Sequence, residues 1–173
     1  MKRMLFKAIA LLLGLAMGLS FAACGGDEPQ APKKTDTVVV NYYMSLSDEY
    51  YDLWDIEVSY TGPGGQMTTE AADMDWSLEL KLNAADEIPT KYAFKVVAKP
   101  KAKAPTPDPD KLYTLTSECF VRISCQDKDG KELTAAGMIF PEPERVTVSG
   151  RTLAGLVTKT QTIIDREYSV IIE

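Results

Sequence analysis

The chain has 173 residues and a formal net charge of −6, and it contains no histidine. The absence of histidine excludes Ser-His-Asp and Cys-His catalysis, histidine general bases and the zinc sites that use histidine ligands. The excess of acidic residues disfavours nucleic-acid partners, because nucleic acids are polyanions.

The first 23 residues have the features of a secretory signal peptide. Three basic residues precede an uncharged, apolar stretch over residues 8–19, which is the order typical of secretory leaders. Small residues then precede Cys24. This segment resembles the lipobox of lipoprotein signal peptides, in which the cysteine is acylated and becomes the new amino terminus. The resemblance implies removal of residues 1–23, lipidation of Cys24, and a protein that its lipid holds at a membrane.

Two other interpretations of the leader remain open. Residues 8–26 are uncharged, and a segment of about 20 apolar residues can span a bilayer as an uncleaved anchor, although Gly14 and Gly18 disfavour this. Residues 20–22 also satisfy the small-x-small rule of an ordinary signal peptidase. That enzyme would release a soluble protein beginning at Ala23.

Residues 24–34 are expected to form a flexible tether behind the lipidated cysteine. The tether contains two prolines and mostly polar side chains, which favour an extended chain. Asp27 and Glu28 follow the cysteine and are similar to the acidic export signal that sends some Bacteroidota-type lipoproteins to the cell surface. We therefore expect an outer-membrane lipoprotein of the cell envelope, at the cell surface rather than on the periplasmic face.

The remaining residues, 35–173, have the patterning of one all-β domain. Without the leader, 150 residues remain with 16 basic and 25 acidic side chains, a net charge of −9 and the length of a single domain. Apolar side chains alternate with polar ones along a series of segments, as in half-buried strands. The predicted strands are 35–46, 54–60, 66–70, 74–82, 92–98, 112–126, 132–140, 145–148 and 167–172.

The connections between these strands carry turn-forming residues. The segment TGPGG at residues 61–65 and the pair Asp-Gly at residues 129–130 predict tight turns. Residues 47–49 predict a turn or a single helical turn capped by Ser47. The alternation ends after Ser149, where the spacing of apolar residues predicts a short helix over residues 151–159 with Ser149 as its cap.

Together these elements predict an all-β fold: an immunoglobulin-like antiparallel β-sandwich of about seven to nine strands, with one short helix before the last strand. The lipobox, the proline-containing tether, the strands and the short helix resemble the small immunoglobulin-like lipoproteins of Bacteroidota. The resemblance rests on the layout of the chain. The resemblance implies the fold and the cellular location. It implies no functional motif, because a fold does not specify a function.

Cys119 and Cys125 are predicted to be free and buried. Both have the inward parity of one strand, where six residues separate them by roughly 20 Å. A disulfide needs Cα atoms within about 7 Å. The nearby sequence Asp127-Lys128-Asp129-Gly130 resembles the opening of a calcium loop, but the pattern's third acid and distant glutamate are missing. We interpret it as a hairpin turn and expect no metal or other cofactor.

Aromatic side chains gather between residues 42 and 60. Aromatic faces beside carboxylates suit sugar rings, and amphipathic aromatic side chains are also common in protein interfaces. The candidate contact residues are Tyr43, Tyr50, Tyr51 and Trp54. The competing interpretation is core packing, because Tyr42, Trp54 and Tyr60 have inward parity. A second feature is the group of Lys99, Lys101 and Lys103. These lysines either form a positive corner that binds an acidic partner or belong to a solvated loop.

Three functions are weighed on this basis. We expect a non-enzymatic lipoprotein anchored to the membrane, whose domain binds a glycan or a protein. The alternative is a fimbrial or accessory subunit that assembles by strand exchange through its first strand or its terminal strand near Ile172. A carboxylate-based hydrolase is the weakest of the three, because the acids are scattered and no pair stands out.

Overall fold

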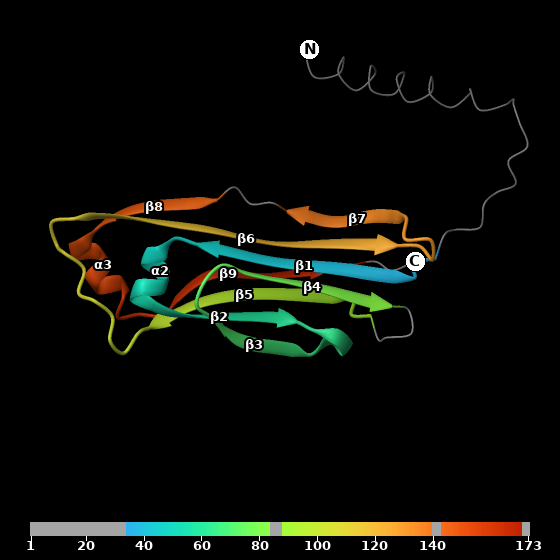
Figure 1. The fold of residues 1–173 in the computed structure, drawn as a ribbon, viewed down its shortest axis with the longest axis horizontal. Helices are drawn as coiled ribbons and strands as arrows, with labels where there is room; N and C mark the ends of the chain where they lie inside the picture. Colours follow the sequence, from blue (N-terminus) through green and yellow to red (C-terminus); the bar gives the residue numbers. More distant parts are fainter. Residues whose placement is uncertain (1–33, 84–87, 140–142, 171–173) are drawn as a thin grey trace, which may run out of the picture. The chain divides into compact units, whose positions relative to one another are not determined.

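The structure is a computed structural model, which describes residues 34–83, 88–139 and 143–170. The signal peptide, Cys24 and nearly all of the tether lie outside these residues. The described residues form nine strands, two short α-helices and one 3-10 turn (Figure 1). No helix in them is long and apolar enough to cross a membrane. The elements are β1 (Thr37–Leu46), α2 (Asp48–Leu53), β2 (Trp54–Thr61), η1 (Pro63–Gly65), β3 (Met67–Ala72), β4 (Trp76–Asn83), β5 (Lys91–Pro100), β6 (Leu112–Gln126), β7 (Glu132–Ile139), β8 (Glu144–Ser149), α3 (Gly150–Leu156) and β9 (Gln161–Ser169).

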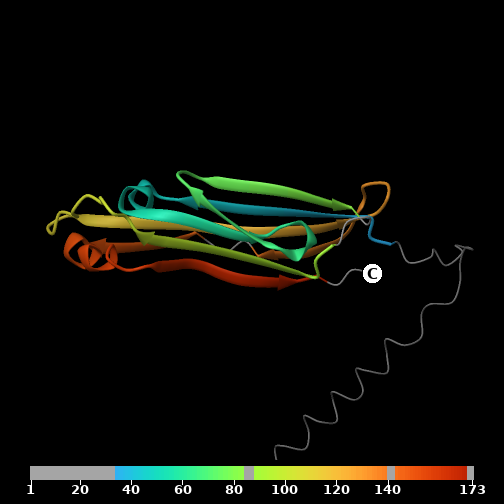
Figure 2. The same cartoon turned by 90° about the horizontal axis from the view of Figure 1, so that it is seen from below.

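The strands form two antiparallel sheets that lie face to face (Figure 2). Sheet A has the order β4-β1-β6-β7, and β8 also pairs with β6. Sheet B has the order β3-β2-β5-β9. Strand β6 is long enough to pair with β8 along its first half and with β7 along its second half. The predicted antiparallel β-sandwich with a short helix before the last strand is confirmed.

Alternating side chains of β1, β6, β2 and β5 fill the space between the sheets. Tyr42 on β1 is 1% exposed, and its hydroxyl donates to the backbone oxygen of Thr61 on β2 at 2.8 Å. The hydroxyl oxygen of Thr61 accepts from the backbone N–H of Ala93 on β5, also at 2.8 Å. A buried hydroxyl without a partner is destabilising, so this chain of bonds both satisfies Tyr42 and ties sheet A to sheet B.

The structure corrects the expectations for Met74 and Ser47. Strand β4 begins only at Trp76, and Met74 is 71% exposed in the crossing from sheet B to sheet A. In that crossing, the Asp75 carboxylate accepts from the backbone N–H of Leu46 at 3.3 Å, which holds the segment at the end of β1. Ser47 precedes α2 but makes no side-chain cap; its hydroxyl oxygen accepts from the backbone N–H of Thr116 at 3.2 Å.

Strand β9 begins at Gln161, earlier than the sequence predicts. The pairing with β5 shifts between Val96, opposite Ile164, and Val97, opposite Thr162. Ile163 is therefore an extra residue, a β-bulge. The bulge interrupts the alternation of apolar and polar side chains, which is why the sequence predicts no strand over residues 161–166.

Helix α3 is held by its cap and by the proline-containing loop before β6. The Ser149 hydroxyl accepts from the backbone N–H of Thr152 at 3.3 Å, which confirms the predicted cap. Gly150, the first residue of the helix, donates from its N–H to the backbone oxygen of Lys111 at 2.8 Å. A Cβ at Gly150 would lie 1.7 Å from the backbone oxygen of Asp108, so only glycine allows the loop to pack this closely.

Replacing Gly150 by alanine therefore forces the loop away from α3, and we expect the variant to lose about 1–3 kcal/mol of unfolding free energy. The matched control is Gly155→Ala in the same helix, where an added Cβ meets no atom within 4 Å. That variant should gain about 0.5–1 kcal/mol, because alanine favours helix over glycine. Urea unfolding of both variants checks the difference, and equal midpoints would contradict the close packing.

Candidate functional site

The four candidate contact residues lie in three different places. Tyr43 is on the outer face of sheet A, partly exposed. Tyr51 lines a hollow at the end of β1, whereas Tyr50 and Trp54 line a cavity between the sheets. Trp54 is only 2% exposed and packs in the core, as its inward parity indicates. The four side chains therefore do not form one continuous surface.

Tyr43 forms a stacked aromatic pair with Phe120 on the outer face of sheet A. The register of β1 and β6 sets the two residues directly opposite each other. Their ring centroids are 4.7 Å apart and their planes meet at 22°. Both point outward because their neighbours Tyr42 and Val121, one position earlier and one later, are buried. The two rings therefore cover one face of each other and form a compact, partly exposed aromatic pair at the centre of the sheet.

A row of polar side chains runs beside this aromatic pair. Asn41 of β1 lies between Glu79 of β4 and Arg122 of β6 in the strand register. Glu79 and Arg122 are exposed, so their charged groups are accessible. The two rows line a shallow depression of about 400 Å³. We call this surface the sheet A platform; it consists of Asn41, Tyr43, Ser77, Glu79, Phe120 and Arg122.

The outer face of sheet B carries cross-strand ion pairs, whereas on sheet A Glu79 pairs with Lys81 of its own strand at 3.4 Å. Three lysines of β5 meet acids of the neighbouring strands at 2.5 to 2.7 Å. The pairs are Lys91–Glu167, Lys95–Asp165 and Lys99–Glu57. Lys99 is thus neutralised by Glu57, and Lys101 donates to the backbone oxygen of Tyr51 at 2.9 Å. These two members of the predicted positive corner are already engaged within the domain.

Tyr51 lies in an acidic hollow of about 570 Å³. Burial, reinforced by the nearby Asp75 carboxylate, raises the pKa of Tyr51 to about 12, so its hydroxyl stays neutral over the physiological range. The described residues hold no group of three or more side chains that could bind a metal ion. The other residues of the hollow are Leu46, Asp48, Asp52, Asp73, Met74 and Asp75.

The segment resembling a calcium loop is a hairpin turn between β6 and β7, as expected. One carboxylate oxygen of Asp127 accepts from the backbone N–H groups of Asp129 and Lys131, each at 2.9 Å. Gly130 has a φ of +74°, which glycine adopts without strain. The carboxylate of Asp127 therefore stabilises the turn.

Sequence reasoning missed the other members of the sheet A platform. Phe120 is the main omission. Its outward direction could have been predicted, because it alternates along β6 with Cys119 and Val121, which point inward. The sequence does not show that Phe120 lies opposite Tyr43, because this strand pairing joins residues 77 positions apart in the chain. Asn41 and Arg122 also come together with Glu79 only through the strand register.

No family model, curated protein or solved structure matches the chain.

The two cysteines of β6 are free and buried, and their burial confirms the inward parity. Burial, with a smaller effect of Glu118, raises the pKa of the Cys119 thiol to about 12 from an ordinary value of 9.0. Burial also raises the pKa of Cys125. Because thiolates are the reactive species, neither thiol should react readily in the folded domain.

We therefore expect iodoacetamide at pH 8 to leave Cys119 and Cys125 unmodified in native protein and to label both in urea, with peptide mass spectrometry as the readout. The pKa of the Cys119 thiol is about 9 in the unfolded chain and about 12 in the folded domain. Its protonated form therefore stabilises the folded state fully below pH 9, and this contribution to the unfolding free energy is lost as the pH rises from 9 to 12. Rapid labelling of native Cys119 at pH 8 would contradict its burial.

Proposed function

We propose that the protein is a non-enzymatic envelope lipoprotein, anchored to the membrane through Cys24, whose domain binds a glycan partner through the sheet A platform. The single observation that carries the binding proposal is the stacked pair of Tyr43 and Phe120 on an outward face. A protein partner is the other outcome that the tests below distinguish.

The aromatic pair supports binding because the sandwich itself does not need it there. Antiparallel sheets in sandwiches bury one face and present polar residues on the other. Tyr43 and Phe120 interrupt that pattern at the centre of β1 and β6, whereas the outer face of sheet B carries ion pairs. Both rings are partly exposed, and accessible aromatic surface beside polar side chains is a recurring feature of binding surfaces.

The polar row supports a glycan in particular. The apolar C–H face of a sugar ring packs on aromatic faces, and its hydroxyls both donate and accept hydrogen bonds. Asn41 offers both a donor and an acceptor, Glu79 accepts, and Arg122 donates. The polar row lies two residues along the strands from the aromatic pair, which is the spacing of neighbours on one face of a sheet, so a single sugar ring can reach both rows.

The change Tyr43→Ala should remove glycan binding, because it deletes one half of the stacked surface. We expect at least about a tenfold loss of affinity, measured by affinity electrophoresis of the mature chain carrying Cys24→Ser in gels of different polysaccharides. Tyr43→Phe keeps the ring and should bind within about threefold of the native chain. Lys95→Ala, on the outer face of sheet B, is the surface control and should bind normally.

Two results count against this proposal. If no polysaccharide retards the native chain, the glycan partner is wrong. If one does, but Tyr43→Ala migrates like the native chain while remaining folded by circular dichroism, the glycan binds elsewhere than the platform.

The proposed anchor rests on the leader sequence, whose order of basic, apolar and small residues before Cys24 supports lipidation. We expect the native chain to partition into the detergent phase of Triton X-114 and to carry acyl groups on Cys24. The change Cys24→Ser should abolish acylation. A native chain that begins at Ala23 without lipid would show an ordinary signal peptidase instead, and one that retains residues 1–23 would show an uncleaved anchor.

A further inference from the structure

We propose that two copies of this chain associate through β4, which pairs with the β4 strand of the second copy in an antiparallel ladder. Strand β4 lies at the edge of sheet A and pairs on one side with β1. The row of backbone groups along such an edge is a template for pairing with another chain. The association does not rest on the proposed glycan partner, because it is measured without a ligand.

The first argument is the direction of the backbone groups. Residues of a strand between two antiparallel neighbours bond alternately to one neighbour and to the other. The N–H of Ser47, at the end of β1, donates to the backbone oxygen of Thr116 on β6 at 2.9 Å. The N–H of Leu46 donates to Asp75, on the β4 side. The odd-numbered residues of β1 therefore bond to β6, and the even-numbered residues bond to β4.

The strand register carries this alternation into β4. The even-numbered residues of β1 lie opposite even-numbered residues of β4, as Val40 lies opposite Leu80. The even-numbered residues of β4 therefore use their backbone groups within sheet A. The N–H and C=O groups of Ser77, Glu79 and Lys81 point to the outer edge, where a second strand can bond to them.

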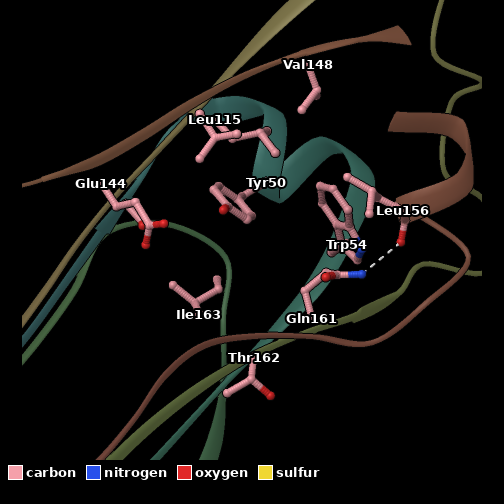
Figure 3. A pocket seen from close by; sticks show the side chains of 11 residues that line it. Tyr50, Trp54, Leu115, Glu144, Val148, Leu156, Gln161, Thr162 and Ile163 are labelled. Carbon is pink, nitrogen blue, oxygen red and sulfur yellow. Dashed lines mark hydrogen bonds between the residues drawn. The ribbon is translucent and has the colours of Figure 1, made fainter. Parts of the chain in front are cut away.

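The second argument is that three other edge strands carry a protection that β4 lacks. Charged side chains that point into the sandwich keep edge strands from pairing with other chains. Glu70 of β3 lies opposite the buried Val58. Arg166 of β9 lies opposite the buried Phe94. Glu144 of β8 lines the cavity of about 190 Å³ between the sheets (Figure 3).

The inner face of β4 is apolar along the whole strand. Its inward-facing side chains, which lie opposite buried residues of β1, are Trp76, Leu78, Leu80 and Leu82. Leu78 and Leu80 remain partly exposed at the edge. The register with β1 is unbroken, whereas the pairings of β7 and β9 contain shifts. A second strand beside β4 would cover the two leucines and extend a regular sheet.

Charge selects the register of the ladder between the copies. Because the backbone groups at the edge belong to odd-numbered residues, odd residues must pair with odd residues. With a twofold axis at Leu80, Glu79 of each copy lies opposite Lys81 of the other, and residues 77–83 overlap. A shift of the axis by one residue sets Glu79 opposite its own copy or Lys81 opposite its own copy, and like charges directly opposite each other destabilise a ladder.

Both charged side chains are accessible for this exchange of partners. Within one copy Lys81 and Glu79 are 3.4 Å apart, and their side chains are 68% and 52% exposed. Such an exposed pair contributes little stability, so its rearrangement across the axis costs little. The twofold axis makes the interface isologous and places the sheet A platforms of both copies on one continuous face.

Sedimentation equilibrium of the mature chain carrying Cys24→Ser, from about 10 to 500 µM, tests the association. The native sequence should show a monomer–dimer equilibrium. Glu79→Lys and Lys81→Glu each set like charges opposite each other, and each should weaken dimerisation at least about tenfold. Lys95→Glu, the same change of charge on the outer face of sheet B, is the matched control and should leave dimerisation unchanged.

Two combinations separate this register from a general effect of charge. The double variant Glu79→Lys/Lys81→Glu exchanges the two charges and should dimerise like the native sequence. A mixture of the two single variants should form a heterodimer, because every charge then lies opposite one of the other sign. Sedimentation of one fluorescently labelled variant, with and without the other, measures this heterodimer.

Engineered cysteines test the position of the axis. Leu80→Cys places two thiols beside the axis, within the Cα distance of about 7 Å that a disulfide needs. In Leu78→Cys the two cysteines are offset by about 13 Å along the strands. Mild oxidation should therefore cross-link the first variant and not the second on a non-reducing gel. The native Cys119 and Cys125 are buried and should not contribute.

A chain that stays monomeric up to about 500 µM would overturn the proposal. Dimers that neither charge reversal weakens, or equal cross-linking of the two cysteine variants, would also overturn it. None of these results bears on the glycan proposal, which is tested with Tyr43 variants and a polysaccharide.

Discussion

The register of β1 against β6 is the constraint on which the rest of the structure depends. It sets Tyr42 opposite Val121 on the inner face and Tyr43 opposite Phe120 on the outer face. Because side chains alternate along a strand, a slip of one residue would exchange the two faces. Burial of the inner residues therefore fixes which residues the outer face presents. The core and the proposed binding surface are two consequences of the same pairing, which explains how a surface feature can be specified by core packing.

The two outer faces and the interior use polar groups in different ways. On sheet B the lysines of β5 are paired across strands, and such exposed pairs contribute little stability. In the interior, Tyr42 is satisfied through Thr61. Three other buried polar atoms among the described residues have no hydrogen-bond partner: the hydroxyls of Tyr51 and Tyr92 and the Nε1–H of Trp54. The partly exposed aromatic pair of the sheet A platform, rather than the ion-paired face of sheet B, therefore carries the functional proposal.

The sequence predicts the strands well where alternation is uninterrupted and poorly where long-range pairing changes it. The alternation predicts β6 with the bounds that the structure has, residues 112–126, and the predicted cap Ser149 begins α3. Residues 161–166 of β9 are missed because the bulge at Ile163 breaks the period of two. The platform is missed in part because Phe120, Glu79 and Arg122 meet β1 only through pairing with distant strands. Parity identifies which face a residue occupies, but it does not identify its neighbours on that face.

The proposed function requires that the outer face of sheet A, and not that of sheet B, contacts the partner. The most direct measurement is photo-cross-linking in the intact cells that produce the protein, with the photoreactive residue p-benzoylphenylalanine placed at position 43 on sheet A or at position 95 on sheet B. We expect a cross-linked species from position 43 and none from position 95. Adducts from position 95 alone, or equal adducts from both positions, would contradict it.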